Sequence, residues 1–382
     1  MDIIIVFLII YGLYQMQIDS IITNNSFKTL KYNKRFFNYL FFIHLLFYII
    51  YLVYSYYNRS DSGMYYLRAK FVEEWFSLFQ SGTLFIDFIT HPFVIYFHMS
   101  YESVMLLFSF FGFEGFLLLY LAAKENISNL PIKFAGFTVL ELLFLLPNSH
   151  FWSVSIGKGC VMLMGIGLFF YGLSRFNSRF VYLLIGSCII YMVRMHVLIG
   201  ILIGVGFGMI FGKVKVSMLF KVLTSVICIL GFYYIYNNVV IETGMEFGLD
   251  GDSNESVSHL ANELGKSNSG VDIGNYNQFF KLFTFLFRPL FFDAPSVIGL
   301  FTSIEDIIYI ILFINFLYNG IFKIRSLNGY FMICFISFLV VSISLAQISG
   351  NLGIAVRQKA QIMPLFFLVY SKFITLRSNI KK

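Results

Sequence analysis

The amino-acid sequence predicts an all-α polytopic integral membrane protein with about eleven transmembrane helices. Of its 382 residues, 58% are hydrophobic and 12% are charged, whereas soluble globular proteins carry about 25% charged residues. Apolar runs that approach the roughly 20 residues needed to cross a bilayer recur from one end of the sequence to the other. We find no internal repeat and expect one transmembrane domain over residues 1–382.

The expected transmembrane helices are apolar runs bounded by polar or charged residues. The first run, IIIVFLIIYGLY, has no basic region before it and no small-residue cleavage site, so we expect a retained helix rather than a signal peptide. Several runs are shorter than about 20 residues, which allows for one or two re-entrant segments. The expected helices cover 3–16, 36–57, 101–122, 134–147, 159–173, 180–193, 197–212, 218–236, 304–321, 330–346 and 360–375.

The distribution of Lys and Arg predicts an amino terminus outside and a carboxyl terminus in the cytoplasm, because cytoplasmic loops are enriched in basic residues. Two larger segments then lie outside, at 58–100 and 237–303, and the second contains the acidic polar stretch GLDGDSNESVSHLANELGKSNSG. The basic residues assigned to the cytoplasmic side are Lys28, Lys31, Lys34, Arg35, Lys124, Lys133, Arg175, Arg179, Lys213, Lys215, Lys221, Lys323, Arg325, Lys372, Arg377, Lys381 and Lys382.

Several other basic residues fall outside, where this rule does not favour them, and most of them adjoin apolar sequence. Cations at membrane depth are costly and normally face a polar cavity or an anionic partner. Because the arginine fork bonds two oxygens at once, the pattern predicts a phosphate-type anion site. The alternative is snorkelling, or pairing with Asp61, Asp293, Glu305 or Asp306. The outer cations are Arg68, Lys70, Lys158, Arg194, Arg288, Arg357 and Lys359.

Arg194 interrupts the apolar run FVYLLIGSCIIYMVRMHVLIGILIGVGFGMIF, which is too long for one crossing. Two crossings of about 14 and 16 residues would each be about 21–24 Å long, shorter than the bilayer core. The turn from Arg194 to His196 would then lie in a depression below the outer surface. Lys158, at the end of HFWSVSIGK and the start of an apolar run, is expected to join the same group of cations.

Acidic and histidine side chains near such a site are candidate bases. A carboxylate can act as a general base on a sugar hydroxyl, and Asp61 opens the first outer segment. His196 follows Arg194 by two residues and is the second candidate. Glu114 and Glu141 lie within expected helices, where an acid is a functional-site hypothesis by default.

Composition and motifs also exclude some partners and chemistries. The net charge of +7 does not indicate nucleic-acid binding, since the basic residues are scattered between apolar runs. The four cysteines lie inside apolar runs without a CxxC or metal-ligand spacing, and no Walker A, GxGxxG, HExxH or GxSxG motif occurs. We therefore expect no metal, no cofactor and no nucleic-acid partner.

Four stretches together resemble a known family. They are PNSHFWSVSIGKG before an apolar run, RMH at an interruption, FRPLFFDAP before SIEDIIYI, and NLGIAVRQK before the last apolar run. Over most of its length the chain resembles bacterial polysaccharide repeat-unit polymerases of the O-antigen polymerase (Wzy-type) group. Related sequences carry an acid after the lysine of the FWS…GK stretch. Here Gly159 stands there, so no acidic role is carried over.

The resemblance implies a metal-independent glycosyltransferase of the bacterial inner membrane, with its outer segments in the periplasm. The donor would be a growing glycan on undecaprenyl diphosphate, and the acceptor a single lipid-linked repeat unit. The acceptor hydroxyl would attack the anomeric carbon, and polyprenol diphosphate would leave. The implied partners are lipid-linked glycans, membrane lipids, a chain-length regulator and a flippase.

Placed cations would stabilise the negative charge that develops on the leaving diphosphate. The base would be Asp61 or His196. The expected diphosphate-binding residues are Arg194, Arg288 and Arg357, with Lys158 and Lys359 assisting.

Three other functions stay open at this point. An O-antigen ligase, which transfers glycan to a lipid core, would use the same chemistry. A flippase or transporter of lipid-linked oligosaccharide is expected to show cations in a cavity open to both sides, and often a repeat. An acyltransferase would favour a catalytic histidine, for which His196 is the candidate.

Overall fold

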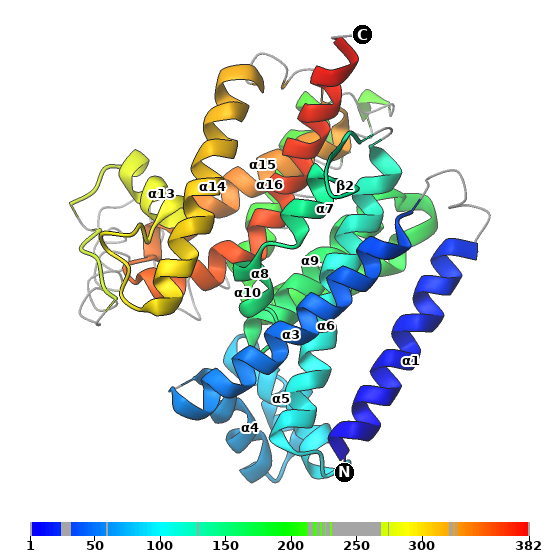
Figure 1. Cartoon of the computed structure of the whole chain (residues 1–382), viewed down its shortest axis with the longest axis vertical. Helices are drawn as coiled ribbons and strands as arrows, with labels where there is room; N and C mark the ends of the chain where they lie inside the picture. The colour runs from blue at the N-terminus through cyan, green and yellow to red at the C-terminus, as the bar shows by residue number, and fades with distance from the viewer. Residues whose placement is uncertain are drawn as a thin grey trace. The chain divides into compact units, whose positions relative to one another are not determined.

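The described part of the chain is mostly helical (Figure 1). The computed structural model describes residues 2–23, 32–58, 60–127, 130–212, 217–219, 222–223, 226, 230, 269–273, 275–320, 324 and 327–380. Packing divides the chain into two compact units, Met1–Arg194 and Met195–Lys382. Each unit is described by itself.

Seven helices in the described part of the chain are long and apolar enough to cross a membrane. They confirm the predicted class, a multi-pass α-helical membrane protein, while the number and direction of the crossings stay predictions. Most of the expected helix 218–236 and the stretch 237–268 lie outside the described residues. The seven candidate spans are Asp2–Thr23, Lys34–Tyr57, Tyr101–Asn126, Phe176–Phe211, Val297–Asn319, Gly329–Ile348 and Leu352–Arg377.

Helix α6 (Tyr101–Asn126) forms the core of unit 1 and packs most extensively against α9 (Lys158–Ser174). Glycines bring these two helices close together, since a Cβ atom at Gly167 would lie 2.7 Å from the carbonyl oxygen of Gly115. On its other sides α6 contacts α1 (Asp2–Thr23) and α3 (Lys34–Tyr57). These helices supply the rigid frame from which the shorter segments of the unit project.

The described residues of segment 58–100 form short helices, none of which is long enough to be a candidate span. It consists of α4 (Asp61–Phe71), the short 3-10 helix η1 (Trp75–Leu78) and α5 (Thr83–Ile95). The indole N–H of Trp75 in η1 donates to the backbone oxygen of Phe88 in α5 at 2.8 Å. Helices α4 and α5 pack against each other and against α6 (Figure 1).

The expected helix 134–147 does not form. Strands β1 (Ile132–Phe134) and β2 (Phe137–Thr138) pair in an antiparallel hairpin there, followed by the six-residue helix α7 (Val139–Phe144). The prediction of a transmembrane helix relied on apolar composition alone, and the backbone conformation of this stretch is not that of a continuous helix.

The turn of this hairpin ends any continuous helix. Ala135 and Gly136 have φ values of 50° and 84°, in the left-handed region that an α-helix excludes. Thr138 and Glu141 then form a capping box that starts the short helix. Pro147 begins α8 (Pro147–Phe151), which leads toward Lys158.

Helix α10 (Phe176–Phe211) is interrupted where the sequence predicts an interruption. Arg194 has φ −153° and ψ 87°, which is non-helical, and Arg179 is a second irregular position. The boundary between the two units follows Arg194 directly. The apolar run is therefore two helical pieces, as its length and its charged residue predict.

Unit 2 contains α13 (Gln278–Phe287), α14 (Val297–Gly320), α15 (Gly329–Ile348) and α16 (Leu352–Ile380). Helix α15 packs chiefly against α16. The second piece of α10 also approaches α15 closely, since a Cβ atom at Gly204 would lie 2.0 Å from the hydroxyl of Ser337.

Candidate anion-binding site

A group of charged side chains in unit 1 is built by α4, α5, the first residue of α9 and the break in α10. Helix α4 contributes Asp61, Tyr65 and Arg68, whose spacing places them on one face of the helix. Helix α5 contributes Asp87. We call these four residues, together with Lys158 and Arg194, the α4–α9 cluster.

Arg68 and Asp87 form the best-defined contact of the cluster. The guanidinium donates from Nε to Oδ2 at 2.8 Å and from Nη2 to Oδ1 at 3.2 Å. The Asp87 side chain is completely buried, whereas that of Arg68 is 37% exposed. The fork is thus held by one edge while part of the Arg68 side chain stays exposed, and an arginine fork is suited to anion recognition.

Tyr65 lies between Arg68 and the start of α9. The Arg68 guanidinium carbon lies 5.0 Å from the centroid of the Tyr65 ring. A Cβ atom at Gly157 would lie 3.5 Å from the Cε2 atom of the same ring. The tyrosine therefore connects α4 to the residue just before Lys158.

Lys158 is positioned by a turn that also contacts α10. A Cβ atom at Gly82 would lie 3.9 Å from the Lys158 Nζ. Gly82 has φ +83°, a conformation that glycine adopts without strain. Its backbone N–H donates to the oxygen of Met192 at 2.7 Å, two residues before Arg194. The loop before α5 thereby brings the start of α9 and the break in α10 to the same place.

The electrostatics of the cluster favour an added anion. The pKa of Lys158 is lowered from 10.5 to about 8, chiefly by burial and then by the nearby positive charges of Arg194 and Arg68. Asp61 and Asp87 act in the opposite direction without compensating fully. A bound anion would favour the protonated ammonium, because it would offset the two guanidinium charges.

The segment that leads to Lys158 is anchored by His150 of α8. One ring nitrogen of His150 lies 2.8 Å from the Phe144 backbone oxygen, and the other lies 2.8 Å from Nδ1 of His44 in α3. The remaining nitrogen of His44 lies 2.9 Å from the backbone oxygen of Ser109 in α6. Both histidines are buried, so this pair holds α8 against α3 and α6.

Two of the residues predicted in unit 2 have carboxylate partners. The Lys359 Nζ lies 2.5 Å from Oδ1 of Asp306, and both side chains are fully buried. The same ammonium donates to the backbone oxygen of Arg288 at 3.1 Å. Arg288 itself forms an ion pair with Asp293. Pairing with these acids is the alternative that the sequence left open.

The predicted residues therefore fall into two groups. Unit 1 brings Asp61, Lys158 and Arg194 into one electrostatic neighbourhood. Arg288, Arg357 and Lys359 belong to unit 2, as does His196, which follows the break in α10. A common site for all of them stays a prediction from the sequence.

Sequence reasoning missed two members of the α4–α9 cluster as site residues. Asp87 lies in the apolar stretch FIDFITHP, where an isolated acid is a signal for a buried partner. Tyr65 carried no signal, because its role depends on contacts between segments. Arg68 was recognised as an outer cation but not assigned to the diphosphate.

Comparisons with family models, with curated proteins and with solved structures give no match. Among the described residues, no group of three or more His, Cys, Asp or Glu side chains is arranged to hold a metal ion. The functional proposal rests on the chemistry of the residues described above.

Proposed function

We propose that this chain is a metal-independent glycosyltransferase that polymerises oligosaccharide units carried on undecaprenyl diphosphate, at the periplasmic face of a bacterial inner membrane. The observation that supports this proposal is the grouping of three cations, Arg68, Lys158 and Arg194, with the two acids Asp61 and Asp87. The excess positive charge suits a substrate that carries a diphosphate.

The leaving group explains why a glycosyltransferase would need such a cluster. As the glycosidic bond breaks, negative charge develops on the diphosphate oxygen that was bonded to the sugar. Cations that are already in place stabilise this charge more in the transition state than in the ground state, and they do so most strongly where water is excluded. Arg68 is held in place by Asp87, so little reorganisation is needed.

Asp61 is the proposed base. Its carboxylate would accept the proton of the acceptor hydroxyl while the hydroxyl oxygen bonds to the anomeric carbon and the carbon–diphosphate bond breaks. Asp61 interacts electrostatically with Lys158 and Tyr65, which places it in the cluster. His196 is the second candidate, and Arg288, Arg357 and Lys359 are proposed to act on the diphosphate from unit 2.

The topology belongs to the same proposal. The amino terminus and segments 58–100 and 237–303 would be periplasmic, and the carboxyl terminus cytoplasmic, with about eleven crossings. This orientation would place the α4–α9 cluster on the side where lipid-linked repeat units are displayed. A chain-length regulator and a flippase would work with the enzyme.

Deletion of the gene, followed by electrophoresis of the surface polysaccharide, tests the proposal. A polymerase defect leaves lipid core carrying a single repeat unit and removes the ladder of longer chains, and the wild-type gene restores the ladder. A ligase defect would instead leave polymer on its carrier lipid and none on the core. A flippase defect would leave no repeat unit at the outer face, and an unchanged ladder would contradict all three activities.

A further inference from the structure

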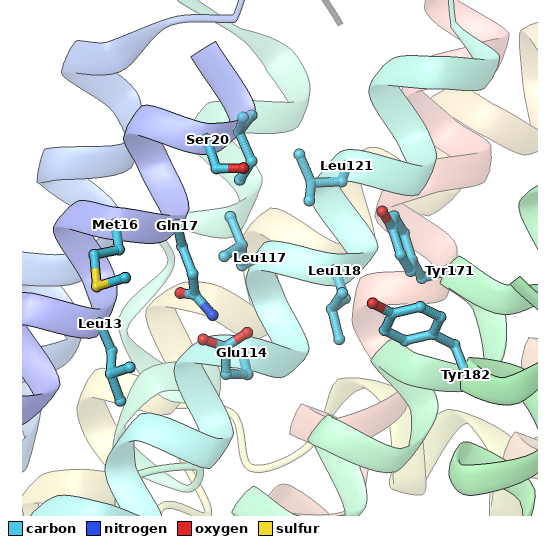
Figure 2. A pocket seen from close by; sticks show the side chains of 11 residues that line it. Leu13, Met16, Gln17, Ser20, Glu114, Leu117, Leu118, Leu121, Tyr171 and Tyr182 are labelled. Atoms are coloured by element: carbon cyan, nitrogen blue, oxygen red, sulfur yellow. The ribbon is translucent and has the colours of Figure 1, made fainter. Parts of the chain in front are cut away.

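A cavity separate from the α4–α9 cluster lies between α1, α6, α9 and the first piece of α10 (Figure 2). Its volume is about 540 Å³. Leucine, isoleucine and methionine side chains make up most of its wall. The polar residues that line it are Gln17, Ser20, Glu114, Tyr171 and Tyr182.

Among the residues that the structure describes, two polar atoms of side chains lining this cavity have no hydrogen-bond partner. Figure 2 shows the amide nitrogen of Gln17 pointing at the carboxyl group of Glu114, and these side chains are hydrogen-bonded. Oε1 of Glu114 and Oε1 of Gln17 are both buried, and in the described part of the chain neither has a partner. Buried polar atoms of this kind are rare in native proteins and indicate a missing partner.

The position of Glu114 favours its neutral form. It lies near the middle of the candidate transmembrane helix α6, about 20 Å from either end at 1.5 Å per residue. An unpaired carboxylate at that depth is costly, and among the described residues no basic side chain pairs with Glu114. A neutral carboxyl offers an O–H donor, and the Gln17 carbonyl offers an acceptor.

The cavity is lined partly by exposed side chains of unit 1, two of them on the candidate transmembrane helix α1. Three of its lining residues are exposed apolar or aromatic side chains: Leu13 at 44%, Met16 at 71% and Tyr182 at 44%. A ligand that enters this way comes from the lipid phase. It must therefore be largely apolar and uncharged, because an ammonium or carboxylate would lose its hydration on the path.

We propose that this cavity binds a neutral long-chain alcohol. Its hydroxyl accepts a hydrogen bond from the Glu114 carboxyl and donates one to the Gln17 carbonyl, so that a single group satisfies both atoms. Its hydrocarbon chain packs against Leu117, Leu118 and Leu121. An alkane of equal length would fill the same volume and leave both polar atoms without a partner.

Dicyclohexylcarbodiimide, a lipid-soluble reagent for neutral carboxyl groups, tests this proposal on the full chain in lipid nanodiscs. The Glu114 O–H adds across one C=N bond, with oxygen bonding to the central carbon and the proton passing to nitrogen. The acyl group then migrates from oxygen to nitrogen, which gives a stable N-acylurea that retains every atom of the reagent. We expect mass spectrometry to locate this adduct at Glu114, and none there with a charged, water-soluble carbodiimide.

Competition then identifies the ligand class. A saturated long-chain primary alcohol should slow the labelling several-fold, while the alkane of equal length should leave the rate unchanged. Gln17→Leu should keep the labelling and lose the protection by alcohol, whereas the matched cavity variant Ser20→Ala should keep both. Glu114→Gln should carry no adduct.

Four results would each overturn the proposal. They are the absence of an adduct at Glu114, equal labelling by the charged reagent, equal protection by the alkane, and full protection of Gln17→Leu by the alcohol. None of them bears on the polysaccharide ladder, so this proposal and the proposed polymerase activity fail separately.

Discussion

The guanidinium of Arg68 donates two hydrogen bonds to the carboxylate of Asp87, a side chain that is completely buried while Arg68 stays 37% exposed. A buried acid that holds one edge of an arginine fixes its orientation without covering its other edge. Lys158 interacts electrostatically with the same pair. Asp87 thus positions one cation of the α4–α9 cluster and leaves the cluster with excess positive charge.

Asp87→Asn should weaken this positioning. The amide cannot accept two charge-assisted hydrogen bonds, and the exposed Arg68 can turn toward solvent, so we expect a loss of about 1–2 kcal/mol in stability. Thermal unfolding of the purified protein in detergent measures this loss. Glu73→Gln, at an exposed position of the same segment, is the control and should unfold like the wild type. Equal unfolding of the two variants would contradict the role given to Asp87.

Arg194→Ala should abolish the long-chain polysaccharide ladder while the protein remains in the membrane. The substitution removes a cation placed at the break in α10, and loss of one such transition-state contact typically costs about 10²–10³-fold in rate. Arg175→Ala is the matched control, because Arg175 pairs with Glu125 at 3.3 Å, away from the cluster. A normal ladder in Arg194→Ala would remove this residue from the mechanism.

Hydropathy and charge correctly predicted the break in α10. At 134–147 they predicted a transmembrane helix that does not form. In α10 the charged Arg194 interrupts an apolar run that is too long for one crossing, and the structure breaks there. In 134–147 the deciding feature is the positive φ of Ala135 and Gly136. A turn of that kind changes backbone conformation without changing hydropathy, so a count of apolar residues does not detect it.

The same contrast holds for the site. Lys158 and Arg194 were predicted because cations beside apolar sequence are rare, and that signal is local. The partner of Arg68 depends on two helices folding against each other across 19 positions. The partner of Lys359 lies 53 positions away, and sequence alone could name Asp306 only as one of several acids.

Removal of one partner of the Lys359–Asp306 pair should destabilise the protein strongly. Both side chains are fully buried, and leaving one charge alone in such a place costs about 3–5 kcal/mol. Lys359→Met should therefore unfold at much lower temperature or accumulate poorly. The double variant Lys359→Met with Asp306→Leu should recover most of the stability. If the double variant is as unstable as Lys359→Met alone, the loss of stability does not come from leaving Asp306 without its partner.

Chemical labelling of single cysteines tests the predicted orientation. In a variant without the native cysteines, Glu73→Cys should react with an impermeant maleimide added to the periplasmic side. Ser178→Cys should react only after the membrane is opened, since its neighbours Arg175 and Arg179 are among the residues assigned to the cytoplasm. Reversed accessibility would place the α4–α9 cluster on the wrong side for lipid-linked repeat units.

The pH dependence of polymerisation should follow Lys158. Its pKa is lowered from 10.5 to about 8 by burial and by Arg194, so the ammonium is lost as pH rises through about 8, and the apparent second-order rate constant should fall there. Lys158→Arg should show a flat profile across this range, because guanidinium stays protonated.

The stability of the protein should change with pH in the opposite direction to the rate. Between pH 8 and 10.5 the unfolded lysine binds more protons than the folded one, so the wild type gains stability relative to Lys158→Arg as pH rises. Measured together in purified protein, a rate that falls while stability increases identifies Lys158, whereas a parallel loss of both would point to unfolding instead.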